Sequence, residues 1–128
     1  MIILDTHAWL WWMNESTKLS FKAKEAIQEA TLIGIPAICC WEIAMLVDKS
    51  RIGLSMGVEV WFELALKHPK VNLLPLTPAI ATLSTQLPEN FHGDPADRLI
   101  VATSLIHRAP LVSKDQKIQN SDSVKVIW

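Results

Sequence analysis

Five carboxylic acids lie directly beside the apolar segments that are the best candidates for a folded core: Asp5, Glu42, Asp94, Asp97 and Asp115. Carboxylates from separate segments repel one another at close range unless a proton or a cation lies between them. A hard divalent cation that prefers oxygen ligands, Mg²⁺ or Mn²⁺, would satisfy such a cluster. The pattern therefore favours a metal site, provided that the fold brings these acids to one place.

The elements that must position these acids are short apolar strands that alternate with helices. We expect strands at residues 1–4, 32–35, 71–74, 111–113 and 124–128, the last at an edge of the sheet. Apolar residues at helical spacing predict helices at residues 8–13, 21–30, 38–49, 56–67, 78–87 and 95–108. This alternation predicts a single three-layer α/β/α domain over residues 1–128 with a mainly parallel sheet. In such sheets, ligands bind at the carboxyl ends of the strands.

The composition excludes several other classes of protein. The chain has 128 residues and a formal net charge of -1, so it lacks the cationic surface of a strongly basic nucleic-acid clamp. An enzyme that handles nucleic acid through metal ions is not excluded. Cys39 and Cys40 are adjacent, which argues against a disulfide framework and fits a reducing cytoplasm. The sequence contains no glycine-rich nucleotide-binding motif, and its longest apolar stretch, Leu32–Trp41, is too short to span a bilayer.

Most of the acids also have a simpler structural interpretation. Asp94 stands at an N-cap position, and capping is our preferred role for it. Asp5 could likewise cap the helix that follows it, and Glu42 could form an ion pair with Arg98 or a lysine. We expect Asp97 to face the site from the first turn of its helix, where the helix dipole favours an anion.

The histidines do not indicate a zinc site. None of the four histidines has the spacing typical of zinc ligands. His7 and His92 lie close to acidic positions and could assist a proton transfer, although structural hydrogen bonding is the commoner role of histidine.

Four segments of the sequence resemble the motifs of a known family. They are Ile-Leu-Asp-Thr-His at residues 3–7, Trp-Glu-Ile-Ala at 41–44, Gly-Asp-Pro-Ala-Asp-Arg-Leu-Ile-Val-Ala-Thr at 93–103 and Leu-Val-Ser-Lys-Asp at 111–115. Over nearly the whole chain, the sequence resembles a PIN domain, and more narrowly a VapC-type toxin of a toxin–antitoxin pair. The resemblance implies a Mg²⁺- or Mn²⁺-dependent endoribonuclease of α/β/α fold in the cytoplasm. Such proteins are usually dimeric and are neutralised by a small DNA-binding antitoxin.

The resemblance also implies roles for individual residues. The family's acidic quartet corresponds to Asp5, Glu42, Asp97 and Asp115, and its hydrogen-bonding support to Thr6, Asp94 and Ser113. Of the quartet, we expect the three aspartates to bind the metal. Glu42 would bind it directly or through water, or orient the nucleophile. Arg98, Lys114 and Lys117 are candidate contacts for RNA phosphates.

Two other functions stay open at this point. Asp5 would also suit a phosphoryl-transfer enzyme with an aspartyl nucleophile, but such enzymes usually carry a second Asp two positions on, where this chain has His7. The other alternative is a PIN-like module that binds a partner without catalysis.

Three tryptophans in one short helix cannot all face the same core. At about 100° per residue, Trp9 and Trp12 share a face of the helix, whereas Trp11 points to a neighbouring side. We therefore assign Trp9 and Trp12 to the core and Trp11 to a surface that binds a partner.

Overall fold

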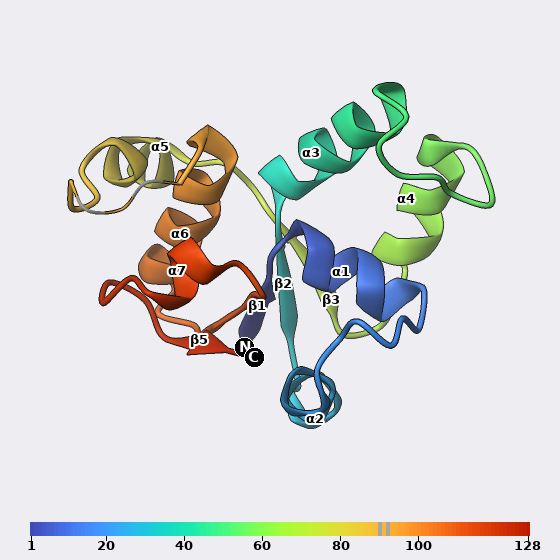
Figure 1. Ribbon diagram of the computed structural model, residues 1–128, viewed down its shortest axis with the longest axis horizontal. Coiled ribbons are helices and arrows are strands. Elements are labelled where there is room, and N and C mark those ends of the chain that lie inside the picture. Colours follow the sequence, from blue (N-terminus) through green and yellow to red (C-terminus); the bar gives the residue numbers. More distant parts are fainter. Residues whose placement is uncertain (90, 92) are drawn as a thin grey trace.

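A parallel sheet of short strands forms the centre of the molecule: β1 (Ile2–Leu4), β2 (Ile33–Pro36), β3 (Val71–Leu74), β4 (Leu111–Val112) and β5 (Val126–Ile127). The computed structural model (Figure 1) describes residues 1–89, 91 and 93–128, and its sheet has the order β3-β2-β1-β4-β5. Each pairing between neighbouring strands is parallel. The carboxyl ends of the strands therefore lie at one edge of the sheet. His92 lies outside the described residues, and its role stays a prediction.

Helices connect the strands and cover both sides of the sheet. They are α1 (Thr6–Met13), α2 (Phe21–Glu29), α3 (Ala37–Asp48), α4 (Val58–Leu66), α5 (Pro78–Thr85), α6 (Pro95–His107) and α7 (Gln116–Gln119). In Figure 1, α5, α6 and α7 lie to the left of β1, whereas α1, α3 and α4 lie to its right. The predicted α/β/α arrangement with a parallel sheet is thereby confirmed. Of the helices in the described part of the chain, none is long and apolar enough to cross a membrane.

The predicted elements are confirmed with shifts of one or two residues at their ends, and two differences affect the site. α1 begins at Thr6, two residues earlier than predicted, because the Asp5 side chain caps it by accepting a hydrogen bond from the Ala8 amide. α7 was not predicted. It forms because the Asp115 side chain accepts hydrogen bonds from the amides at the start of this short helix.

The core lies between the sheet and the inner faces of the helices. β1 is buried along its whole length, and α6 buries five consecutive residues, 100–104, as expected for a central helix. Trp9 is fully buried against Trp61, with 5.0 Å between the ring centroids, so its assignment to the core is confirmed. The assignment of Trp12 was wrong. Trp12 is half-buried at the end of α1, where it packs on the outer part of the core and beside His68.

Candidate active site

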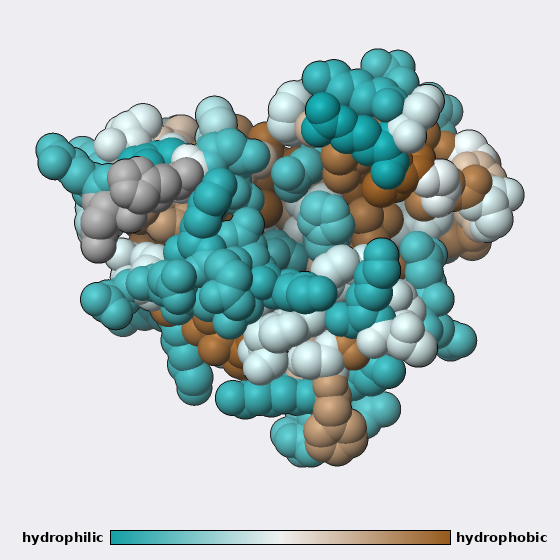
Figure 2. Space-filling model, viewed as in Figure 1, coloured by the Kyte–Doolittle hydropathy of each residue, from teal (hydrophilic) through white to brown (hydrophobic). Residues whose placement is uncertain are grey.

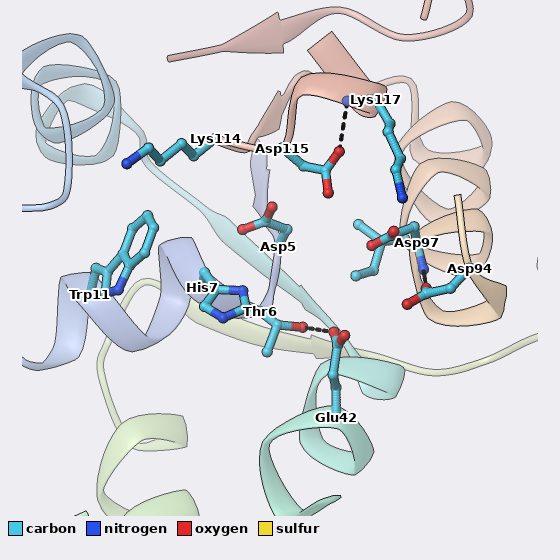
Figure 3. Close-up of a pocket in the computed structure, with 11 residues that line it drawn as sticks. Asp5, Thr6, His7, Trp11, Glu42, Asp94, Asp97, Lys114, Asp115 and Lys117 are labelled. Atoms are coloured by element: carbon cyan, nitrogen blue, oxygen red, sulfur yellow. Dashed lines mark hydrogen bonds between the residues drawn. The ribbon is translucent and has the colours of Figure 1, made fainter. Parts of the chain in front are cut away.

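An open pocket of about 520 Å³ collects side chains that come from distant parts of the sequence. Its lining comprises Asp5, Thr6, His7, Trp11, Glu42, Asp94, Asp97, Ile100, Lys114, Asp115 and Lys117. All five acids that the sequence singled out are among them, and Figure 3 shows their carboxylates around a common space. The pocket lies at the carboxyl end of the sheet, where the strands β1 and β4 run into the segments that carry Asp5 and Asp115.

Three of the acids are also helix N-caps. Asp5 Oδ1 accepts from the Ala8 amide at 2.9 Å, and Asp94 Oδ1 accepts from the Asp97 amide at 2.8 Å. Asp115 Oδ1 accepts from the amides of the second and third residues of α7, at 2.8 and 3.2 Å. In each of the three aspartates, only Oδ1 accepts the capping hydrogen bonds, and Oδ2 takes no part in them. Capping and ion binding are therefore compatible, and the two interpretations of Asp5 and Asp94 do not compete.

Glu42 is held by Thr6, which the sequence analysis expected to support the acids by hydrogen bonding but did not pair with Glu42. The Thr6 hydroxyl donates a hydrogen bond to Glu42 Oε1 and so joins the start of α1 to α3 (Figure 3). The contact that the structure gives Glu42 is therefore a hydroxyl, not the cation of the alternative ion pair with Arg98 or a lysine. This bond fixes the carboxylate of Glu42 without neutralising its charge.

Burial and mutual repulsion make two of the carboxyl groups weak acids. Burial raises the pKa of Asp5 to about 6, and the negative charge of Glu42 adds to this, although hydrogen bonds from Ser113 and Ala8 oppose the shift. Burial also raises the pKa of Asp97 to about 7, with further contributions from the charges of Asp94, Asp115 and Glu42. The pocket thus holds more negative charge than it can carry without a proton or a cation.

The donor set fits a hard divalent cation. The acids present carboxylate oxygens, which Mg²⁺ and similar ions prefer, and they outnumber the one imidazole in the lining, that of His7. In the part of the chain that the structure describes, no three Asp, Glu, His or Cys side chains are already grouped as the ligands of one ion. The acids surround an open space, as expected for a cation that keeps several of its waters.

Ser113 supports the site through its buried hydroxyl. Its side chain is completely buried at the end of β4, and its hydroxyl accepts a hydrogen bond from the Asp115 amide at 3.1 Å. The same hydroxyl favours the charged form of Asp5 and so lowers the pKa of that group. Ser113 therefore connects two of the acids without lining the pocket itself.

Only two of the three predicted phosphate contacts line the pocket. Lys114 and Lys117 line the pocket and are exposed. Arg98 is not part of the lining, and its guanidinium donates to the carbonyl oxygens of Ser84 and Phe91, at 2.9 and 3.0 Å. These two bonds join α6 to Ser84 in α5 and to Phe91 in the segment that follows, so the structure favours a structural role for Arg98, and its contact with phosphate stays a prediction.

One wall of the pocket is aromatic, and its main residue is Trp11, which the sequence analysis did not assign to the pocket. Trp11 is half-buried and packs between His7 and Trp128, with ring-centroid distances of 5.6 and 5.8 Å. The Lys114 ammonium lies 5.7 Å from the centre of the Trp11 ring. The structure thus places Trp11 in the pocket wall, and its contact with a partner stays a prediction. Its spacing of four residues from His7 in α1 was the available signal.

The chain is an α/β/α protein with a parallel sheet and an acid-lined pocket at the carboxyl ends of its strands, where sheets of this class bind their ligands. The model of the PIN domain matches residues 2–123, and the chain belongs to this family. It is 38% identical over 119 residues to Ribonuclease VapC22 of Mycobacterium tuberculosis (strain ATCC 25618 / H37Rv), covering 93% of this chain and 90% of that protein. The family suggests that the site uses a divalent metal ion.

Solved structures share the fold. A toxin-antitoxin complex from Klebsiella pneumoniae matches with a TM-score of 0.72 and 19% identity, over 100% of this chain and 97% of the other. VapBC2 from Rickettsia felis, bound to a DNA fragment from its promoter, matches with a TM-score of 0.71 and 15% identity, over 98% and 97% of the two chains. At these identities, the likeness establishes the fold alone.

Proposed function

We propose that the protein is a Mg²⁺- or Mn²⁺-dependent endoribonuclease and the toxin of a toxin–antitoxin pair that acts in the cytoplasm. The observation that carries the proposal is the acidic pocket: carboxylates from four separate places in the chain surround one open space at the sheet edge. The membership of the PIN family and the similarity to a protein named as a ribonuclease support the choice of RNA as substrate.

In this proposal, Asp5, Asp97 and Asp115 hold the cation. A divalent cation in this position supplies charge neutralisation of the scissile phosphate and a water of lowered pKa. The three carboxylates must be ionised to act as ligands, so Asp97 gives up the proton that its raised pKa lets it retain near neutral pH. The capping bonds fix the orientation of Asp5 and Asp115 before any ion enters.

The remaining residues of the pocket position the reacting groups. Glu42, fixed by the Thr6 hydroxyl, faces the space between the aspartates and orients the attacking water through its free oxygen. Lys114 and Lys117 attract the RNA backbone to a site that would otherwise repel it. Ser113 keeps Asp5 and Asp115 in register through the hydrogen bonds described above.

A protein partner is the second part of the proposal. The solved complexes of similar fold contain an antitoxin, and one of them is bound to promoter DNA. Hydrophobic residues gather around α3 and α4 in the space-filling view (Figure 2), and Trp41, Val60 and Leu64 of these helices are exposed. Exposed apolar patches of this kind are typical of protein interfaces. We propose that a small DNA-binding antitoxin neutralises the protein, and that the free protein is a homodimer.

Incubation of the purified protein with labelled RNA tests the enzymatic proposal. We expect internal cleavage with Mg²⁺ or Mn²⁺ and none with a chelator, while circular dichroism reports the same fold in both conditions. Asp97→Asn should lower the cleavage rate by about 100-fold or more, whereas Asp122→Asn, an exposed acid outside the pocket, serves as the matched control.

Three outcomes would contradict the enzymatic proposal. Cleavage that persists in the chelator and in Asp97→Asn would show that the acidic pocket is not the source of the activity. A phosphorylated Asp5, trapped during turnover of a phosphate ester, would favour the aspartyl-nucleophile alternative. Tight binding of a partner without any RNA cleavage would favour a non-catalytic module.

A further inference from the structure

A second cavity lies on the other side of the aromatic wall. Its volume is about 780 Å³, which falls within the range of ligand sites, about 300–1,000 Å³. Its lining comprises His7, Leu10, Trp11, Asn14, Ser16, Thr17, Lys18, Arg51, Ile52, Gly53 and Leu54. His7 and Trp11 also line the acidic pocket, so the two cavities share a wall. A ligand long enough to cross this wall would occupy both.

The second cavity has the opposite electrostatic character. The described residues that line it include Lys18 and Arg51, both exposed, and no carboxylate. Asn14, Ser16 and Thr17 add amide and hydroxyl groups that can donate hydrogen bonds. A cavity with this lining disfavours a metal ion and suits an anionic, polar ligand.

The wall between the cavities has the features of a stacking platform for a nucleobase. Trp11 is held on one side by Trp128 and on another by His7, so its ring is fixed before any ligand arrives. The ammonium of Lys114 lies 5.7 Å from the centre of the same ring. Proteins that bind single-stranded nucleic acid combine aromatic rings, on which unpaired bases stack, with cations that follow the backbone.

We propose that the second cavity is a binding site for an unpaired nucleotide that flanks the cleaved bond. The base of this nucleotide stacks on the Trp11 and His7 wall, and its phosphate contacts Lys18 and Arg51. This inference rests on the proposed function, because it assumes that RNA enters the acidic pocket. It adds that the substrate is single-stranded where it leaves that pocket, since a base paired in a duplex cannot reach the wall.

Binding of a labelled single-stranded RNA of mixed sequence, about 12 nucleotides long, tests the charged part of the site. Fluorescence anisotropy in a chelator keeps the RNA intact. The double variant Lys18→Gln/Arg51→Gln should bind about tenfold more weakly at about 50 mM salt. The slope of log affinity against log salt concentration should fall by about 1.4, because each lost phosphate contact removes about 0.7 for a single strand.

Matched variants separate the site from a general effect of charge or of aromatic surface. Lys22→Gln/Lys125→Gln removes the same charge from exposed residues outside both cavities and should leave the affinity unchanged. Trp11→Ala should weaken binding by about fivefold or more, and Trp11→Phe should restore most of it. Phe21→Ala, at an aromatic residue that is 80% exposed on α2, is the control for the loss of a ring.

The outcomes distinguish this inference from the proposed function. If the Lys18 and Arg51 variant binds and cleaves RNA as the control does, the inference is overturned and the nuclease proposal stands. If the wild type shows the predicted binding pattern but cuts no RNA with Mg²⁺ or Mn²⁺, the nuclease proposal fails and the binding site stands. The inference is overturned if the wild type binds duplex RNA as tightly as single-stranded RNA, or if it binds no RNA. It is also overturned if the Lys18 and Arg51 variant loses binding to a protein partner but keeps its affinity for RNA.

Discussion

Replacing Asp97 with asparagine should make the metal-free protein more stable while it destroys the activity. In the folded protein, burial and the charges of Asp94, Asp115 and Glu42 raise the pKa of Asp97 from 3.8 to about 7. A shift of this size corresponds to about 4 kcal/mol for a fully buried group. Because Asp97 is partly exposed and solvent screens its neighbours, we expect the variant to gain about 1–2 kcal/mol at about pH 8.

The change in stability caused by Asp97→Asn should depend on pH. Below about pH 4, Asp97 is protonated in both the folded and the unfolded states, so the substitution should change the stability little. As the pH rises from about 4 to about 7, the unfolded chain loses the proton first, and the folded wild type becomes less stable relative to it. Above about pH 7, Asp97 is ionised in both states, so the difference in free energy of unfolding between the variant and the wild type stays constant. Asp97→Asn should show its full gain in stability there.

Urea unfolding in a chelator, followed by tryptophan fluorescence at about pH 4 and about pH 8, measures both quantities. Asp122→Asn, at an exposed acid outside the pocket, is the control and should show no gain at either pH. Addition of Mg²⁺ at about pH 8 should stabilise the wild type more than Asp97→Asn, because the ion binds only the folded site. Two results would refute the view that crowded negative charge destabilises the site. In one, Asp97→Asn is less stable than the wild type at about pH 8. In the other, its gain in stability over the wild type is the same at both pH values.

Four further substitutions test the positions of individual side chains. Asp94→Asn keeps a good cap, so we expect RNA cleavage to fall far less than in Asp97→Asn; equal losses would place Asp94 among the metal ligands. Trp9→Ala should cost about 3–5 kcal/mol in urea unfolding, and Trp12→Ala, which removes a half-buried ring, clearly less; equal costs would contradict the corrected position of Trp12. Arg98→Gln should cost about 2 kcal/mol without changing the affinity for RNA, and a loss of affinity at unchanged stability would restore Arg98 as a phosphate contact.

The sequence predicted the elements well because apolar runs and caps are local signals. The helix that carries Asp97 was recognised from the cap at Asp94, the proline after it and the apolar stretch that follows, and these features form it in the structure. The five acids were predicted to converge because the carboxyl ends of parallel strands meet at one edge, and they line one pocket.

The side-chain partners were harder to predict because they depend on packing between distant elements. The contact between Thr6 and Glu42 joins residues that are far apart in sequence, and no local rule pairs them. Arg98 has the residue type of a phosphate contact, but two of its donors bond the carbonyl oxygens of Ser84 in α5 and Phe91 in the following segment, a packing that its residue type does not show. For Trp11, helix periodicity gave a direction relative to the other tryptophans but not the location of Trp128, which packs against its ring.

The way in which three acids cap helices explains how a cluster of repelling carboxylates can exist before a cation binds. The amides at the starts of α1, α6 and α7 stabilise the negative charges of Asp5, Asp94 and Asp115, and each helix in turn depends on its acid for an N-cap. Asp97 lies in the first turn of α6 but is not a cap, and its pKa of about 7 is higher than the pKa of Asp5, about 6. Burial and the charges of its neighbours therefore both act on an aspartate whose loss costs no cap, and Asp97 should ionise at a higher pH than Asp5 when the site prepares to bind a metal ion.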